Sequence, residues 1–120
     1  MTEDEFRSIA LSLPETSESA HMGHPDFRVR GKIFATLWPD HEWGVVILSP
    51  EEQARVVRTM PDVFVPVKGG WGRRGSTQVR LDRVEESTLC SALVAAWQRV
   101  APKGLATTAQ INFSRDLGSV

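Results

Sequence analysis

Three glycines in the stretch GGWGRRGS, residues 69–76, are spaced as in loops that hold nucleotide phosphates. Gly70, Gly72 and Gly75 form the pattern G-x-G-x-x-G, which binds a pyrophosphate when a strand precedes the loop and a helix follows it. The segment that follows here, residues 76–84, is STQVRLDRV, and its apolar and polar residues alternate as in a strand. The helix N-terminus that would hold the phosphate is therefore missing, and we expect no nucleotide cofactor.

The same stretch carries an aromatic residue among basic ones, and we interpret it as the tip of a β-hairpin whose glycines form the turns. Two interpretations of Trp71 stay open. The ring stacks on a base or sugar while Arg73 and Arg74 neutralise phosphates, or it folds back onto the core beneath the hairpin. We favour the core position, because large apolar rings are usually buried.

Basic residues are clustered along the chain, although its formal net charge is only −1. Residues 66–84 hold five basic residues against one acidic residue, and residues 26–32 hold three against one. Residues 1–19 are acidic instead, with five acids and one arginine. The overall charge argues against a general nucleic-acid binder, whereas the two basic clusters could attract a polyanion if they share a surface.

Other residues with chemical potential form no convincing catalytic or metal site. His21, His24 and Asp26 are close in sequence, and His41 follows in a turn. A metal site needs three or four converging ligands, and the first two histidines span a strand end and a turn, so we predict no metal. Cys90 stands alone, which excludes an internal disulfide and suits a reducing cytoplasm. Without a nucleophile beside a base, we predict that the protein is not an enzyme.

The elements that must position these residues follow from periodicity and from start and stop signals. Thr2 and Glu5 form a capping box, Ser49 and Pro50 begin a second helix, and a third carries Leu89, Leu93 and Trp97 on one stripe. We expect helices over residues 2–13, 49–60 and from about 85 to the proline at 102, and strands over residues 17–22, 26–30, 33–37, 43–48, 63–67 and 76–84.

This order, α-β-β-β-β-α-β-β-α, predicts an α+β domain. Short connections favour an antiparallel sheet of five or six strands with helices packed on it. Residues 1–105 form the single domain, and residues 106–120 are a tail that we expect to be flexible because it shows no periodicity.

Several segments resemble the MmcQ/YjbR family of small bacterial proteins over about residues 3–105. These are LPETSESAHMGHPDFRVRGKIFATL, the helix start SPEEQ, and VKGGWGRRGSTQVRLDRV followed by ESTLCSALVAAWQRVAPKGL. The resemblance implies a frataxin-like α+β fold with a "double wing" motif proposed to bind DNA. The wings would be the hairpins at residues 28–32 and 68–83, tracking duplex phosphates with little sequence readout. The residues in contact with DNA would be Arg28, Arg30, Lys32, Lys68, Trp71, Arg73, Arg74 and Arg80.

Two competing interpretations remain beside DNA binding. The first is a module for a small molecule or a protein partner, with its pocket between the sheet and the glycine loop and no catalysis. The second is a soluble fold whose arginines only face solvent. DNA binding through both wings requires the basic residues on one contiguous face, without acidic neighbours. With no signal peptide and no apolar stretch long enough for a membrane span, we expect a cytoplasmic monomer or weak dimer.

Overall fold

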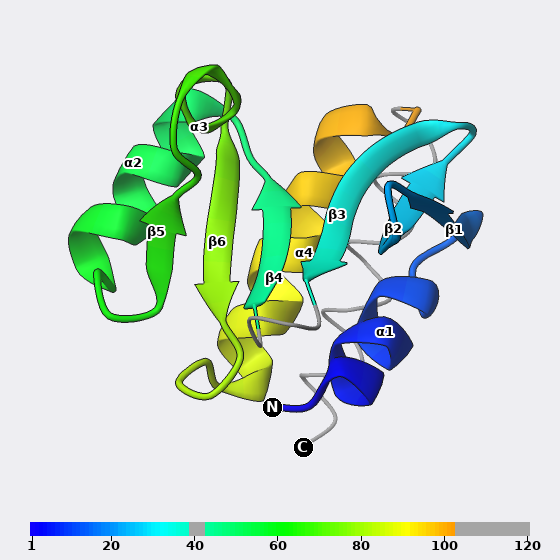
Figure 1. The fold of residues 1–120 in the computed structure, drawn as a ribbon, viewed down its shortest axis with the longest axis horizontal. Coiled ribbons are helices and arrows are strands. Elements are labelled where there is room, and N and C mark those ends of the chain that lie inside the picture. Colours follow the sequence, from blue (N-terminus) through cyan, green and yellow to red (C-terminus); the bar gives the residue numbers. More distant parts are fainter. Residues whose placement is uncertain (39–42, 103–120) are drawn as a thin grey trace.

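Six strands form one antiparallel sheet in the order β1-β2-β3-β4-β6-β5 (Figure 1). The computed structural model describes residues 1–38 and 43–102 of the chain. The strands are β1 (Thr16–His21), β2 (His24–Val29), β3 (Lys32–Trp38), β4 (Trp43–Ile47), β5 (Phe64–Pro66) and β6 (Ser76–Arg80). The first four strands follow one another across the sheet, and β6 then returns between β4 and β5. The predicted α+β class and the antiparallel sheet are confirmed.

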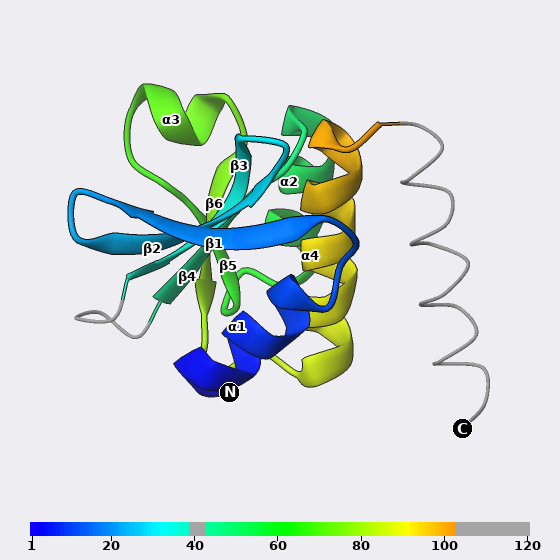
Figure 2. The same ribbon diagram turned by 90° about the vertical axis from the view of Figure 1, so that its right-hand side faces the viewer.

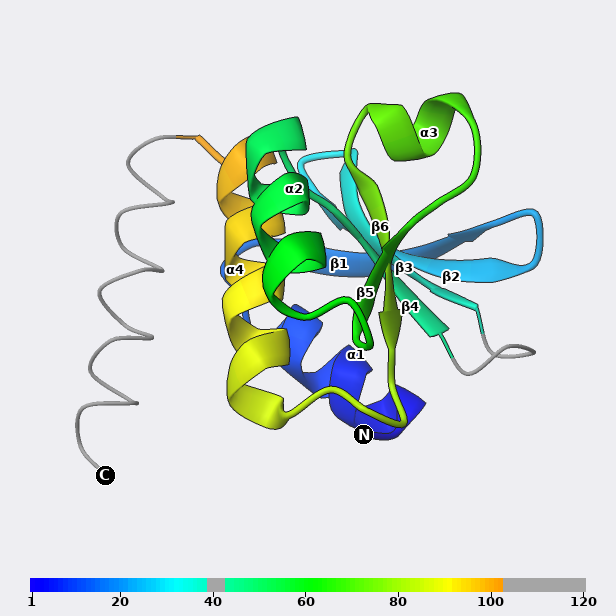
Figure 3. The ribbon, with the colours of Figure 1, turned by 90° about the vertical axis from the view of Figure 1, so that its left-hand side faces the viewer.

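Three helices cover one face of this sheet, as the two side views show (Figures 2 and 3). They are α1 (Glu3–Leu11), α2 (Pro50–Thr59) and α4 (Glu86–Val100). A fourth, α3 (Gly70–Arg73), is a single short turn that projects toward the opposite face. The core lies between the three longer helices and the sheet, and its largest fully buried side chains are Trp97, Phe6, Phe27, Phe34, Phe64, Leu13, Leu37, Leu48, Leu89 and Leu93.

The helix starts follow the predicted capping signals. The hydroxyl of Thr2 accepts a hydrogen bond from the backbone of Glu5, and the Glu5 carboxylate accepts one from the backbone N–H of Thr2. Ser49 caps α2 in the same way through the backbone N–H of Glu52, with proline at the first helical position. These bonds satisfy backbone donors that have no partner within the helix, and so fix where each helix begins.

The turn between β2 and β3 is also as predicted. Arg30 and Gly31 both have positive φ, +50° and +83°, as two-residue hairpin turns of type I′ require. The turn fixes the register of the hairpin, which pairs Val29 with Lys32. One wing of the sequence interpretation is therefore a real hairpin.

One local prediction was wrong. The stretch expected to be a hairpin tip contains the helix α3, so the element order gains a helix between β5 and β6. The predictions for residues 39–42, including His41, and for the tail fall outside the described residues.

Candidate functional site

Two of the three glycines of the G-x-G-x-x-G pattern, Gly72 and Gly75, allow close packing of the α3 loop, which we define as residues 68–75. A Cβ atom on Gly72 would lie 1.7 Å from the carbonyl oxygen of Val67, and one on Gly75 would lie 1.7 Å from that of Leu48. Gly75 also has φ +114°, a conformation that other residues rarely adopt. A Cβ on Gly70, in contrast, would meet nothing within 4 Å. At Gly72 and Gly75 the backbone of this loop lies against the residues that directly follow β5 and β4.

Gln53 on α2 fastens the loop to the rest of the protein. Its Nε2 lies 2.8 Å from the carbonyl oxygen of Gly72, 3.1 Å from that of Ser76 and 3.2 Å from Oγ1 of Thr77. Leu48 in turn donates its backbone N–H to the carbonyl of Gly75 at 2.9 Å. The sequence analysis missed Gln53, because no spacing rule links a helical glutamine to a loop 19 residues away. The result is a loop whose backbone is held in one position.

Trp71 stands in solvent on this loop. Its relative exposure is 68%, so the expectation that it packs onto the core is wrong. The guanidinium carbon of Arg74 lies 5.8 Å from the centre of the indole ring, within the range of a cation–π contact. The exposed indole and the guanidinium beside it present an aromatic face and a positive charge at the same point of the surface.

Lys68, Arg73 and Arg74 are the basic residues on the same loop as Trp71. All three side chains are exposed, and none forms an ion pair with a residue in the described part of the chain. The structure therefore brings together four of the eight predicted contact residues, including Trp71, on one short loop.

The arginines of the other wing are neutralised by acidic neighbours. Arg28 binds the carboxylate of Asp26 through Nε at 2.7 Å and Nη2 at 3.0 Å. Arg30 binds Glu15 through Nη2 at 3.0 Å. Arg28 and Arg30 are therefore engaged within the fold, and the contiguous set of free arginines that the two-wing interpretation required does not form.

The remaining predicted contacts lie apart from the α3 loop. Lys32 is exposed at the start of β3. In the sheet, β4 lies between β3 and β6, the strand that follows α3. Arg80 is the last residue of β6, and α3 comes before the first residue of that strand, so the two lie at opposite ends of β6. Arg80 pairs in register with Trp43 of β4. Neither cation has an ion-pair partner among residues 1–38 and 43–102.

Asp26 is the centre of a small polar cluster on the sheet. Its side chain has no solvent exposure, and the Nδ1 atom of His21 lies 2.8 Å from its second oxygen. The hydrogen bonds from Arg28 hold the pKa of Asp26 below its ordinary value, against the opposing effect of burial, and the contact with His21 acts in the same direction. His24 stacks on Trp38 instead, with ring centres 4.9 Å apart. The two histidines thus point to different partners, and no set of three metal-ligating residues occurs within the described ranges.

Cys90 is half-buried on α4, and burial raises the pKa of its thiol, with the nearby charge of Glu86 acting in the same direction. A raised pKa leaves less of the reactive thiolate, which disfavours a nucleophilic role. In the described residues no helix is long and apolar enough to cross a membrane.

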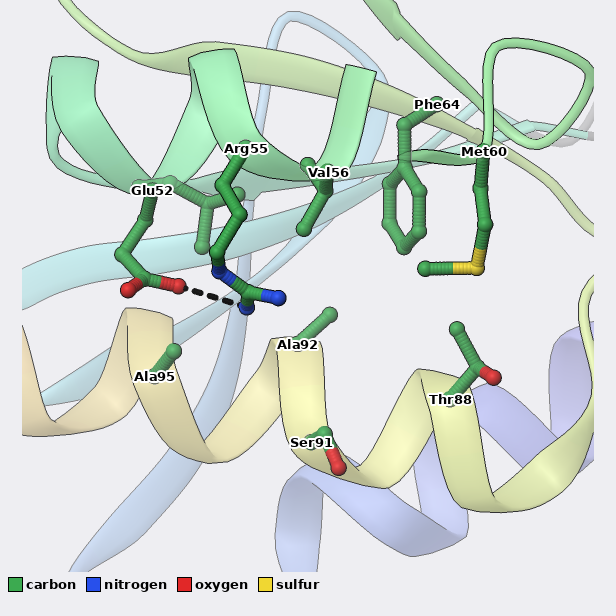
Figure 4. A pocket seen from close by; sticks show the side chains of 10 residues that line it. Glu52, Arg55, Val56, Met60, Phe64, Thr88, Ser91, Ala92 and Ala95 are labelled. Atoms are coloured by element: carbon green, nitrogen blue, oxygen red, sulfur yellow. Dashed lines mark hydrogen bonds and ion pairs between the residues drawn. The ribbon is translucent and has the colours of Figure 1, made fainter. Parts of the chain in front are cut away.

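A pocket lies between α2 and α4, on the face of the sheet away from α3 (Figure 4). Its volume is about 240 Å³, and it is lined by Leu48, Glu52, Arg55, Val56, Met60, Phe64, Thr88, Ser91, Ala92 and Ala95. This place differs from the expected one between the sheet and the glycine loop, where the backbone of the loop packs directly against Val67 and Leu48.

Comparison with known proteins connects this fold to a family. The family model described as YjbR matches residues 11–99. A crystal structure of the Deinococcus radiodurans protein DR2400, described with the family-model domain DUF419, is similar with a TM-score of 0.70. The similarity covers 98% of this chain and 88% of that chain at 19% sequence identity, which shows a shared fold. No curated protein matches the chain.

Proposed function

Since the chain belongs to the YjbR family, we propose that it binds nucleic acid, with the α3 loop as the contact surface. The observation that carries the proposal is the exposed ring of Trp71 among three cations that have no ion-pair partner in the described residues. Lysine and arginine side chains that bind phosphates release counterions from the nucleic acid, and this release favours binding. An exposed indole can stack on a base.

The rigidity of the α3 loop favours this function. Gln53 and the packed glycines hold the backbone in place, so binding orders only the side chains of the loop. The Arg74 guanidinium already lies over the indole, which keeps the ring and the charge together. The site can contact a phosphate and the neighbouring base at once.

The distribution of charge indicates the side from which a polyanion approaches. Each of the three longer helices begins with acidic residues, namely Glu3, Asp4, Glu5, Glu51, Glu52 and Glu86. These helices cover the face of the sheet opposite to α3 (Figure 2). Of the three helices only α1 has a net charge, −2 from three acids and Arg7, whereas the acids of α2 are balanced by Arg55 and Arg58 and Glu86 of α4 is balanced by Arg99. A polyanion is therefore disfavoured at α1 and attracted to the α3 loop.

We propose a smaller set of contacts than the sequence suggested. Lys68, Trp71, Arg73 and Arg74 form the contact surface, and Lys32 and Arg80 remain candidate phosphate contacts because they are unpaired among the described residues. Arg28 holds the buried Asp26 and is assigned a structural role, whereas Arg30 is left out of the set because it forms an exposed ion pair with Glu15. With so few contacts, we expect weak binding that is governed by phosphates and has little sequence preference.

The test is the fluorescence anisotropy of a short labelled duplex at low salt. The double variant Arg73→Ala/Arg74→Ala should lose most of the binding. The control Arg58→Ala/Arg99→Ala removes the same charge from exposed residues of α2 and α4 and should bind like the wild type. Equal loss in both variants would mean that only net charge matters, and no binding by the wild type would refute the proposal.

A further inference from the structure

The pocket between α2 and α4 is a slot that these two helices leave between them above the core. Protein interiors are normally packed as densely as organic crystals, so an opening of about 240 Å³ between two helices needs a cause. Its floor consists of the core residues Leu48, Val56 and Phe64, each at most 5% exposed. Across from α2, helix α4 presents the small side chains of Ala92 and Ala95, which leave the slot open (Figure 4).

Two opposite charges stand side by side at the mouth of this slot. Arg55 reaches from α2 toward α4, and its Nη2 lies 2.9 Å from Oε2 of Glu52 (Figure 4). The two side chains are 55% and 44% exposed, so the pair itself contributes little to stability. The ion pair occupies one carboxylate oxygen and one guanidinium nitrogen, and the other oxygen and the remaining N–H groups are not engaged by any described residue. Thr88 and Ser91 of α4 line the opposite wall.

We infer that this slot binds a free α-amino acid with an apolar side chain, such as leucine or phenylalanine. The α-carboxylate binds Arg55, the α-ammonium binds Glu52, and the side chain enters the slot over Val56, Met60 and Phe64. A volume of 240 Å³ holds about eight water molecules at roughly 30 Å³ each, which is enough for such a side chain and the atoms next to it.

The pairing of charges selects the zwitterion. A ligand with a carboxylate alone would bind Arg55 but would bring its negative charge beside the negative Glu52. A ligand with an amine alone would bind Glu52 but would bring its positive charge beside the positive Arg55. An apolar amino acid satisfies both groups without breaking their ion pair and removes its apolar side chain from water. This site is separate from the α3 loop and does not depend on nucleic-acid binding.

The experiment is a titration of the ¹⁵N-labelled protein with L-leucine up to millimolar concentration, followed by two-dimensional NMR. We expect saturable shifts confined to amides of α2, α4 and β5. The two analogues that lack one charge, 4-methylpentanoate and isoamylamine, should bind about tenfold more weakly or worse, as should glycine, which has no side chain for the slot. A similar affinity for leucine and 4-methylpentanoate, or shifts that do not saturate, would overturn the inference.

Matched variants test the roles of the residues. Glu52→Gln and Arg55→Gln should each weaken leucine binding about tenfold, since each removes a charged hydrogen bond. Glu51→Gln and Arg58→Gln change neighbouring exposed charges on the same helix that do not line the pocket, and should bind like the wild type. If all four variants bind alike, the mouth charges play no role and the inference fails.

A variant that fills the slot separates binding from folding. Ala95→Leu places a larger apolar side chain at the half-buried wall of the slot, so it should abolish leucine shifts without lowering the thermal unfolding midpoint. Undiminished binding by a folded Ala95→Leu protein would place the ligand elsewhere. If this variant does not fold, the surface variants of α2 still decide the question.

Discussion

Arg28 grips the carboxylate of Asp26 with two hydrogen bonds, 2.7 and 3.0 Å long, on the sheet face away from the helices. Residues that pair across two strands point to the same face of the sheet, so Asp26 shares a face with its partner Thr36. The next residue of β3, Leu37, points to the other face together with its partner Gly44, which lies against Phe6 of α1. An arginine bound in this way supports the sheet and is not free to bind a phosphate. In the 28–32 hairpin only Lys32 has no ion-pair partner among the described residues, whereas in the α3 loop none of the three cations has one.

The Asp26–Arg28 contact makes stability depend on pH in a specific direction. Because the folded state lowers the pKa of Asp26, its contribution is complete above the unfolded value near 4 and is lost as the pH falls toward the folded value. From about pH 7 to about pH 3, the wild type should lose more unfolding free energy than Asp26→Asn. Asp62→Asn, at an exposed position, should decline in parallel with the wild type in urea unfolding. Parallel declines in all three proteins would show that the contact is not coupled to folding.

The glycines of the α3 loop should differ sharply in their tolerance of alanine. Gly72→Ala and Gly75→Ala should each cost about 1–3 kcal/mol of unfolding free energy, because the new methyl group strikes the backbone of Val67 or Leu48. Gly70→Ala should change it by less than about 0.5 kcal/mol, since the site is open. Denaturant unfolding checks this, and equal effects at all three positions would contradict the packing described for the loop.

The core face of α4 can be tested at Leu93, which is fully buried. Leu93→Ala should lower the unfolding free energy by about 2–5 kcal/mol through lost burial and a residual cavity. Leu11→Ala, at a position 39% exposed on α1, should cost much less. Similar losses at the two sites in chemical denaturation would mean that the sheet-facing side of α4 is misassigned.

Trp71 should affect binding without affecting stability. Because the ring is 68% exposed, Trp71→Ala should leave the unfolding midpoint unchanged. If the indole stacks on a base, the same variant should weaken single-stranded binding by about 1–3 kcal/mol and duplex binding by less. Trp71→Phe keeps an aromatic face and should retain most of the affinity in anisotropy titrations. A lower unfolding midpoint in Trp71→Ala would instead show that the ring packs against the core.

Patterns that are local in sequence predicted most of the fold. The capping box at Thr2 and Glu5 and the turn at Arg30 and Gly31 depend on residues a few positions apart, and both are present. The α3 helix could not be predicted in this way. It is too short for periodicity and is held by Gln53 and by backbone from other strands.

The candidate site was predicted in part for the same reason. The cluster around Trp71 is contiguous in sequence, so its members were found together. The pairing of Arg28 had a local signal that was not used, since Asp26 lies two residues earlier on the same face of a strand. The pairing of Arg30 with Glu15 spans 15 residues and depends on how β1 approaches the β2–β3 turn.

The salt dependence of duplex binding is the most direct test of the account. If Lys68, Arg73 and Arg74 each contact a phosphate, log K should fall with log salt with a slope of about −3, and Arg73→Ala/Arg74→Ala should flatten that slope by about 2. Arg28→Ala should leave the slope unchanged in any folded protein, because its charge is held by Asp26. Equal slopes for the wild type and the double variant, or a slope that flattens in Arg28→Ala instead, would contradict the assignment of the α3 loop as the contact surface.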